Sequence, residues 1–233
     1  MKIMTFNTQH CLNYLEQKID FDIMADTIKK CDADIVGLNE MRGECLSAAD
    51  YDDQTAILSR LTGIENYYFA EAIKLGGIKP YGNALLSKLP IISAETIIIP
   101  DPEVKKYDGY YETRCVLKAK LQGGITVLIT HIGLNPDEQE NAVKTIRENL
   151  ADENCILMGD FNMQPDNPIL NPIRERMVDT AKYFTEPKLS FPSDKPEIKI
   201  DYLFVSPDVE VISADIPAIV AADHRPHIAK IEL

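Results

Sequence analysis

Residues 155–162 read Cys-Ile-Leu-Met-Gly-Asp-Phe-Asn, an apolar run that ends in a carboxylate and an amide. Four apolar residues in succession predict a central β-strand that is covered on both faces. Alternation along an extended segment would point Asp160 and Asn162 to the same side, and Gly159 would let another group approach closely. An ordinary turn before Pro165 is the alternative interpretation. The stretch therefore predicts a buried strand with polar side chains at its end.

Other β-rich runs surround this strand along the chain. Residues 115–121 alternate apolar and polar side chains, which predicts a strand with one buried face, whereas residues 125–130 are nearly all apolar. The predicted strands are 2–7, 34–39, 67–72, 83–87, 91–99, 114–121, 125–130, 155–159, 200–205, 209–214 and 226–233. About eleven strands is too many for one small open sheet.

Helical patterns interrupt the strands. An apolar stripe runs from Ile19 to Ile28, residues 50–61 form a second pattern, and residues 136–150 form the best-marked one, with Asn135 as its cap and Pro136 in its first turn. Residues 100–111 and 187–199 are polar loops that contain proline. With no internal repeat or linker, residues 1–233 are expected to form a single α/β domain in which two sheets pack together with helices outside.

The charge balance is acidic. The chain has 24 Lys and Arg against 37 Asp and Glu, a formal net charge of −13. A net-negative surface repels a polyanion unless a basic patch or a metal ion overrides it locally. The five cysteines form no CxxC pair and are expected to be free thiols in a reducing cytoplasm. No export signal or membrane span is indicated, and a monomer is the default expectation.

Polar side chains of the kinds that bind metal or phosphate stand at the ends of most predicted core strands. Each one alone has an ordinary interpretation, such as a turn asparagine, a solvated carboxylate or a packing histidine. Asp201 could pair with Lys199, and Asp223 and His224 could both point inward only from a loop. The set comprises Asn7, Glu40, His131, Asp160, Asn162, Asp201, Asp223 and His224.

Together these side chains suit phosphate chemistry with a divalent metal ion. Hard oxygen ligands from Glu40, Asp223 and the amides favour Mg²⁺, with Mn²⁺ possible, over Zn²⁺. The histidines could donate to phosphate oxygens or move protons, and a carboxylate such as Asp201 could fix a histidine tautomer.

The chain resembles the endonuclease/exonuclease/phosphatase superfamily over its whole length. The resemblance rests on seven ordered matches, of which the pair GDFN and DHRP is the most specific: MTFNTQ, DIVGLNE, YGNALLSK, LITHIG, MGDFNMQPDN, IDYLFVS and ADHRPHIAKIEL. It implies a four-layer α/β sandwich in which two mixed sheets lie face to face, helices cover both outer sides, and the site lies at one end.

The resemblance also implies roles for individual residues. Asn7, Glu40 and Asp223 would bind the metal, with Glu40 the principal ligand. Asp160 would orient or deprotonate the attacking water, Asn162 would bind phosphate or a second metal, and His131 would contact the scissile phosphate. His224 would stabilise the transition state or act as base, with Asp201 as its partner. Asn83 and Arg114 are candidate phosphate contacts, whereas Gln9 stands where abasic-site enzymes carry an acidic metal ligand.

These inferences predict a Mg²⁺-dependent phosphoric ester hydrolase that uses water for in-line attack at phosphorus. Nucleases need Lys and Arg along a groove, and the chain offers few clusters beyond Lys105-Lys106 and the pair Arg174 and Arg176. A small or lipid-like phosphomonoester or phosphodiester is therefore favoured over duplex DNA. A DNA nuclease or abasic-site endonuclease, and an inactive binding member of the family, stay open as alternatives.

Overall fold

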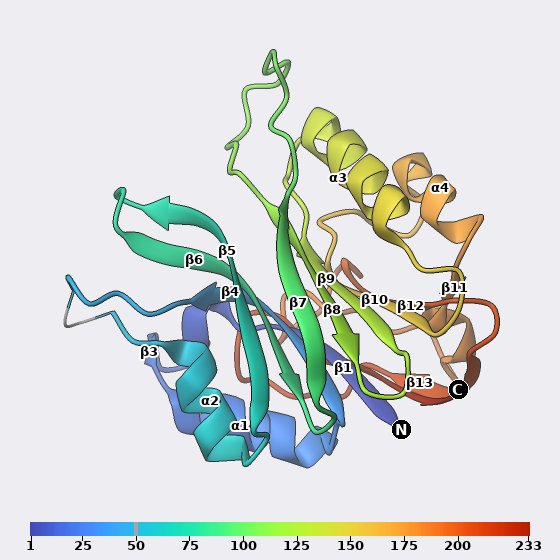
Figure 1. The fold of residues 1–233 in the computed structure, drawn as a ribbon, viewed down its shortest axis with the longest axis horizontal. Helices are drawn as coiled ribbons and strands as arrows, with labels where there is room; N and C mark the ends of the chain where they lie inside the picture. The colour runs from blue at the N-terminus through green and yellow to red at the C-terminus, as the bar shows by residue number, and fades with distance from the viewer. Residues whose placement is uncertain (49–50) are drawn as a thin grey trace.

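The computed structural model describes residues 1–48 and 51–233, which form two six-stranded mixed sheets and a short hairpin (Figure 1). The first sheet has the order β13 (Glu210–Asp215), β14 (His227–Glu232), β1 (Lys2–Asn7), β4 (Ile35–Arg42), β6 (Lys79–Ser87), β5 (Asn66–Leu75). The second has the order β11 (Val178–Asp179), β12 (Asp201–Val205), β10 (Cys155–Asp160), β9 (Thr126–His131), β8 (Cys115–Leu121), β7 (Ile91–Ile98). The hairpin is β2 (Leu12–Asn13) and β3 (Lys18–Ile19).

Each sheet contains one parallel strand pair near its centre. β1 runs parallel to β4, and β9 runs parallel to β10, whereas the other neighbours are antiparallel. The carboxyl ends of both members of a parallel pair lie at the same edge of their sheet. Asn7, Glu40, His131 and Asp160, which lie at or near the ends of these four strands, are thereby gathered at one end of the sandwich.

Helices cover the two outer faces and complete four layers (Figure 1). α1 (Phe21–Cys31) and α2 (Gln54–Thr62) lie on the first sheet, and α3 (Pro136–Asn149) and α4 (Asn171–Arg174) lie on the second. Three short 3-10 helices, η1 (Gln9–Cys11), η2 (Pro168–Leu170) and η3 (Thr180–Tyr183), connect these elements. The predicted α/β four-layer sandwich is confirmed.

Three apolar clusters hold the layers together. The central cluster lies between the sheets and includes Ile3, Ile129 and Met158, all of them fully buried. Alternation along the strands sends neighbouring side chains to the outer clusters under the helices, so that Leu203 faces the other sheet while Tyr202 packs beneath α3 and α4. The nearly continuous apolar runs in the sequence follow from strands that are covered on both faces.

The helix boundaries differ from the sequence prediction mainly at their starts. Ile19 belongs to β3, and α1 begins at Phe21 because Asp20 caps it by accepting from the Ile23 N–H at 3.1 Å. The second predicted helix began at Asp50, which lies outside the described residues; α2 begins at Gln54, capped by Asp53. The third helix begins at Pro136, after Asn135, as predicted.

Two further expectations concern thiols and membrane segments. All five cysteines are free, and four are buried while Cys45 is partly exposed. Among the described residues, no helix has both the length and the apolar character needed to cross a bilayer.

Gly159 is a position where the fold requires glycine. Its φ is 146°, and a Cβ atom there would lie 1.8 Å from the backbone oxygen of Thr130 on the neighbouring strand. The sequence suggested that Gly159 admits some other group. The structure shows that the close neighbour is strand β9 itself, which β10 must approach to place Asp160 beside His131.

Replacing Gly159 with alanine is expected to lower the free energy of unfolding by about 3 kcal/mol or more, because backbone strain and a clash with β9 add together. Urea titration followed by circular dichroism measures this change. Gly123→Ala is the matched control, since Gly123 also has a positive φ of 90° but nothing within 4 Å of the added atom. It should cost about 1 kcal/mol, and equal losses in the two variants would contradict the assignment of the clash.

Candidate functional site

Asp160 lies at the point where the two sheets meet at the end of the sandwich. It is 1% exposed and ends β10, directly opposite His131 on β9 and Asp201 on β12. Its Oδ2 accepts from Asn7 Nδ2 of the other sheet at 3.0 Å and lies 3.6 Å from the Nε2 atoms of both His131 and His224. The carboxylate is therefore the common neighbour of groups from both sheets.

His224 and Asp201 form a buried pair beside Asp160. His224 Nδ1 lies 2.8 Å from Asp201 Oδ2, and the two side chains are 5% and 0% exposed. Because an ionised carboxylate only accepts, Nδ1 carries a proton and donates to Asp201. The ring is thus held with Nε2 toward Asp160. The loop before β14 allows both Asp223 and His224 to reach this region, as their adjacent positions in the sequence required.

His131 is held from its other side by Arg114. Arg114 Nη1 lies 3.2 Å from His131 Nδ1, and Arg114 also pairs with Glu112. Nε2 of the same ring faces Asp160 and the side chain of Asn162, whose Nδ2 lies 3.1 Å away and donates to Ile132 O at 2.9 Å. Guanidinium and amide nitrogens can only donate, and a neutral imidazole accepts at one nitrogen only, so the contacts with Arg114 and Asn162 require different tautomers of His131. The ring is therefore held between donors on both sides, with Nε2 toward Asp160.

Asn162 reaches the site by a route that the sequence did not predict. β10 ends at Asp160, and Asn162 has φ of 50°, in the left-handed region. The prediction that Asn162 continues an extended segment was therefore wrong, although its side chain does approach His131. An amide side chain tolerates this backbone conformation better than most residues.

The two histidines have opposite electrostatic environments. Burial lowers the pKa of His131 well below its ordinary value, and the charges of Arg114 and His224 add to the effect. Burial alone would also lower the pKa of His224, but the carboxylates of Asp201, Asp160 and Asp223 raise it above its ordinary value. His131 is thus neutral and His224 an imidazolium near neutral pH.

Glu40 lies within a strand and not after its end. β4 continues to Arg42, but its register with β6 shifts between Leu38 and Met41, and Glu40 has φ of 61°. A β-bulge of this kind re-aims a side chain next to a site. Glu40 Oε1 accepts from Asn7 Nδ2 at 3.0 Å, and Oε2 accepts from the Tyr81 hydroxyl at 2.9 Å. Both carboxylate oxygens are therefore held in a fixed orientation.

Asp223 completes an acidic group with Glu40. Burial raises the pKa of Asp223 to about 6; His224 opposes this shift and the nearby charge of Glu40 adds to it. Its Oδ1 is buried and has no hydrogen-bond partner among the described residues. Carboxylate charges that repel each other and a carboxylate oxygen without a donor are the features that a hard divalent cation would satisfy. Asn7, Glu40 and Asp223 therefore fit a metal of this class.

Burial also raises the pKa of Asp160, and the charge of Asp201 adds to the shift. The ligand atoms of Asp160, Asp201 and His224 lie within 4.8 Å of one another, which is also compatible with a metal. That group includes an imidazole nitrogen, however, whereas hard cations prefer oxygen ligands. The oxygens of Asn7, Glu40 and Asp223 are the better candidates for a hard cation.

Asn83 is not available to a ligand. It is 2% exposed, its Oδ1 accepts from Asn39 Nδ2 at 2.8 Å, and its Nδ2 donates to Cys115 O at 3.1 Å. The predicted phosphate contact at this position is therefore not kept. The side chain of Asn83 is buried below the site, and both its oxygen and its nitrogen are hydrogen-bonded to protein groups.

Two residues that the sequence did not single out support the site directly. Tyr81 binds Glu40, and Asn39 crosses between the sheets: its Oδ1 accepts from the Asp160 N–H at 3.0 Å and its Nδ2 donates to Thr130 O at 2.9 Å. Asn39 precedes Glu40 inside the quoted motif DIVGLNE, and Tyr81 begins YGNALLSK. Polar residues within otherwise apolar strands were the only signal that could have identified them.

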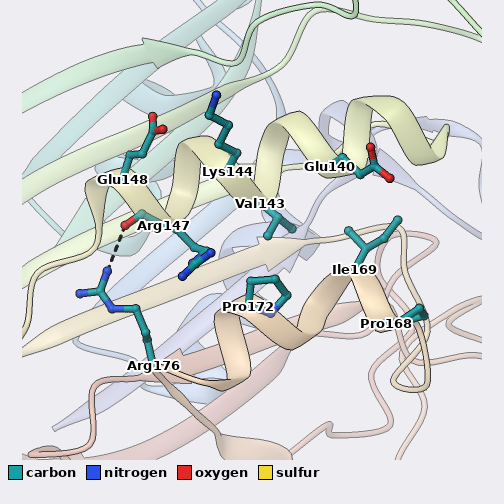
Figure 2. A pocket seen from close by; sticks show the side chains of 9 residues that line it. All are labelled: Glu140, Val143, Lys144, Arg147, Glu148, Pro168, Ile169, Pro172 and Arg176. Atoms are coloured by element: carbon teal, nitrogen blue, oxygen red, sulfur yellow. Dashed lines mark hydrogen bonds between the residues drawn. The ribbon is translucent and has the colours of Figure 1, made fainter.

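A separate groove of about 600 Å³ lies on the helical side (Figure 2). It runs between α3 and the segment of η2 and α4, and none of its lining residues belongs to the group around Asp160. Figure 2 shows Arg176 bonded to the backbone of Arg147 across one end of it. The candidate chemistry therefore does not lie in this groove.

The chain is an α/β sandwich of two mixed sheets and outer helices, with a buried carboxylate–histidine cluster at one end. The model of the Endonuclease/Exonuclease/phosphatase family matches residues 4–224, and the chain belongs to this family. No curated protein sequence matches the chain.

Solved structures share the fold at low sequence identity. An endonuclease/exonuclease/phosphatase from Beutenbergia cavernae has a TM-score of 0.79 and 20% identity, over 100% of this chain and 71% of that one. A mannosyl-6-phosphatase from Bacteroides thetaiotaomicron has a TM-score of 0.76 and 14% identity, over 100% of both chains. A humanized D. rerio TDP2 has a TM-score of 0.67 and 14% identity, over 100% of this chain and 99% of that one.

Tyr81→Phe is expected to weaken the binding of Mg²⁺ or Mn²⁺ about ten-fold, because Glu40 loses the donor that orients Oε2. Isothermal titration calorimetry with the metal alone measures this. Tyr51→Phe is the matched control, since the Tyr51 hydroxyl donates to Pro80 O at 2.6 Å and contacts no site carboxylate. Equal metal affinities in the wild type and Tyr81→Phe would show that Glu40 needs no such support.

Metal affinity is also expected to depend on pH through Asp223. Its pKa is raised to about 6, so protons compete with the cation below this pH and the apparent affinity should fall about ten-fold per unit. Metal titrations at pH values from 5 to 8, about one unit apart, measure how steeply the apparent affinity changes with pH. Asp223→Asn should bind weakly with a flatter profile; an unchanged slope in that variant would assign the competing proton elsewhere.

Proposed function

We propose that the protein is a divalent-metal-dependent hydrolase of a small phosphomonoester or phosphodiester, with Mg²⁺ as the favoured ion and Mn²⁺ as the alternative. The observation that carries this proposal is the position of Asp160. One buried carboxylate oxygen lies 3.0 Å from Asn7 Nδ2 and 3.6 Å from the Nε2 atoms of two histidines, of which His131 is neutral and His224 is charged. A phosphoryl group and an attacking water need a proton acceptor and a cation close together.

Each side chain has a role in this proposal. Asn7, Glu40 and Asp223 hold the metal, which when bound polarises the phosphate and neutralises developing charge. Asp160, with its raised pKa, orients and deprotonates water. His131 contacts a phosphate oxygen, with Asn162 and Arg114 around it. His224, charged and held by Asp201, stabilises negative charge in the transition state.

Small substrates are favoured because several of the basic residues considered for nucleic acid binding already have partners in the structure. Arg114 pairs with Glu112, Arg176 with Asp152, and Lys105 lies over the Tyr111 ring at 4.9 Å. Binding of a nucleic acid backbone requires several cations free to contact phosphates. With a net charge of −13, the surface opposes a polyanion outside the site itself. Metal and site together can hold one phosphoester.

A side-by-side assay tests the proposal on a phosphomonoester, a phosphodiester, a phospholipid and supercoiled plasmid, each with Mg²⁺ and with chelator. Hydrolysis of a small or lipid ester that chelator abolishes is expected. Glu40→Gln should reduce kcat/KM at least about 100-fold through loss of the principal metal ligand. Glu95→Gln, at an exposed carboxylate on β7, is the control and should keep full activity.

Two results would replace the proposal. Efficient plasmid nicking at physiological salt, with weaker action on small esters, would assign a nuclease. Absence of hydrolysis for every ester, together with tight metal or phosphoester binding, would assign a binding member of the family.

A further inference from the structure

Two exposed apolar side chains lie beside the residues proposed to contact the phosphate. Tyr110, in the segment between β7 and β8, is 65% exposed, and Leu134, in the loop between β9 and α3, is 55% exposed. Figure 1 shows the segment between β7 and β8 projecting past the ends of both strands. The proposed chemistry gives neither side chain a role. Large apolar side chains that stay exposed next to a site are candidates for contacts with a ligand.

A chain of polar contacts leads from Tyr110 to His131. The Tyr110 hydroxyl donates to Glu112 Oε2 at 3.2 Å, and Oε1 of the same carboxylate pairs with Arg114 Nη1. That nitrogen lies 3.2 Å from His131 Nδ1. Only the side chains of Glu112 and Arg114 therefore separate the Tyr110 hydroxyl from the histidine, and the aromatic ring lies at the edge of the site.

The start of α3 holds Tyr110 in place. Asn135 Nδ2 donates to Tyr110 O at 2.9 Å, and the Glu112 N–H donates to Glu138 Oε1 at 3.3 Å. Gly109 packs so closely here that a Cβ atom would lie 2.2 Å from Asn135 Oδ1. The ring is thus presented on a backbone with fixed contacts, which lowers the conformational entropy that is lost when a ligand binds.

Leu134 is held next to the other proposed phosphate contact, Asn162. The side chain of Gln139 donates from Nε2 to Leu134 O at 3.4 Å and to Asn162 O at 3.2 Å. Leu134 also directly precedes Asn135, whose side chain binds the backbone of Tyr110. Both exposed side chains are therefore fixed to the same short stretch at the start of α3, close to the residues proposed to contact phosphate.

The groups at this edge of the site indicate which kind of ligand it suits. An aromatic face and an aliphatic side chain pack against C–H groups. The Glu112 carboxylate beside the ring is 11% exposed and can only accept, so it favours ligand groups that donate and opposes further anions. An acyl chain would gain nothing from that carboxylate. A ring that carries hydroxyl groups offers both C–H faces and donors.

We propose that Tyr110 and Leu134 are specificity-determining residues that contact the ring of a sugar phosphate while its phosphate group lies at His131 and Asn162. The inference rests on the proposed function and narrows its substrate class to phosphoesters of a ring that bears hydroxyl groups. The Tyr110 ring packs against one face of the sugar, and Glu112 accepts from its hydroxyl groups. Neither Tyr110 nor Leu134 takes part in the attack on phosphorus.

Kinetics with cyclic and acyclic esters test these contacts. The wild type should hydrolyse at least one of a panel of hexose phosphates with a higher kcat/KM than glycerol phosphate. Tyr110→Ala and Leu134→Ala should each lower this kcat/KM about ten-fold, mainly through KM, because they remove packing against the sugar, and should lower that for glycerol phosphate less. Tyr110→Phe keeps the ring and should keep most of the activity.

Tyr107→Ala is the matched control, at another exposed tyrosine of the same segment, and should behave as the wild type. Equal losses for cyclic and acyclic esters in Tyr110→Ala would overturn the inference, and so would a wild type that prefers glycerol phosphate to every hexose phosphate. Hydrolysis of the acyclic ester would in that case leave the proposed function standing.

A second measurement needs no turnover. The chain has no tryptophan, so Tyr110→Trp introduces a single fluorescent reporter at the proposed contact. Its emission should change saturably when hexose phosphates are added with Mg²⁺, and less with inorganic phosphate. Tyr67→Trp is the control, at an exposed position of β5, and should not respond.

Absence of a response at position 110 to every hexose phosphate would refute the inference. If the wild type hydrolyses no ester, the proposed function fails, whereas the reporter still decides whether a sugar phosphate contacts this residue.

Discussion

Two buried asparagines connect the sheets, and the site depends on them. Asn7 donates from one amide nitrogen to Glu40 and to Asp160, and Asn39 bonds Asp160, Asn83 and Thr130. Apolar packing alone presses two sheets together but fixes neither their register nor their side chains. Hydrogen bonds between fully buried groups have strict geometry, and an unpaired amide there is costly. The two amides therefore set where the carboxylate of one sheet meets those of the other.

This connection explains how one cluster can hold groups in different protonation states. The Nδ1 atom of His131 contacts the positively charged Arg114, whereas the Nδ1 atom of His224 contacts the carboxylate of Asp201. The Nε2 atoms of both rings lie near the same oxygen of Asp160. Neighbouring charge and burial, not residue type, decide which histidine is charged. Two charged histidines would repel each other, and two histidines in the same protonation state would supply the same function.

The sequence was informative where the physics is local and silent where it depends on contacts between sheets. Alternation and apolar runs predicted the main strands, because burial on one or two faces leaves a direct pattern. The motif around Glu40 predicted its role in the site. It did not predict the β-bulge at this residue, which is defined by the pairing of β4 with β6. Tyr81 and Asn39 have no local signature of their contacts. Asn83 was misassigned as a ligand contact because a polar residue in a motif does not reveal whether protein atoms already satisfy it.

The directions of the pKa shifts identify what the site lacks. Burial raises the pKa values of Asp160 and Asp223 and lowers those of His131 and Lys199, so in each case the folded chain disfavours the charged form. Burying the charged form of each of these groups costs free energy relative to leaving it in water. A cation beside Glu40 and Asp223 would favour their ionised forms, and an anion beside His224 would favour its charged form. The unfavourable burial therefore makes the site preorganised for ligands of both signs, which is the electrostatic requirement for cleaving a phosphoester held by a metal.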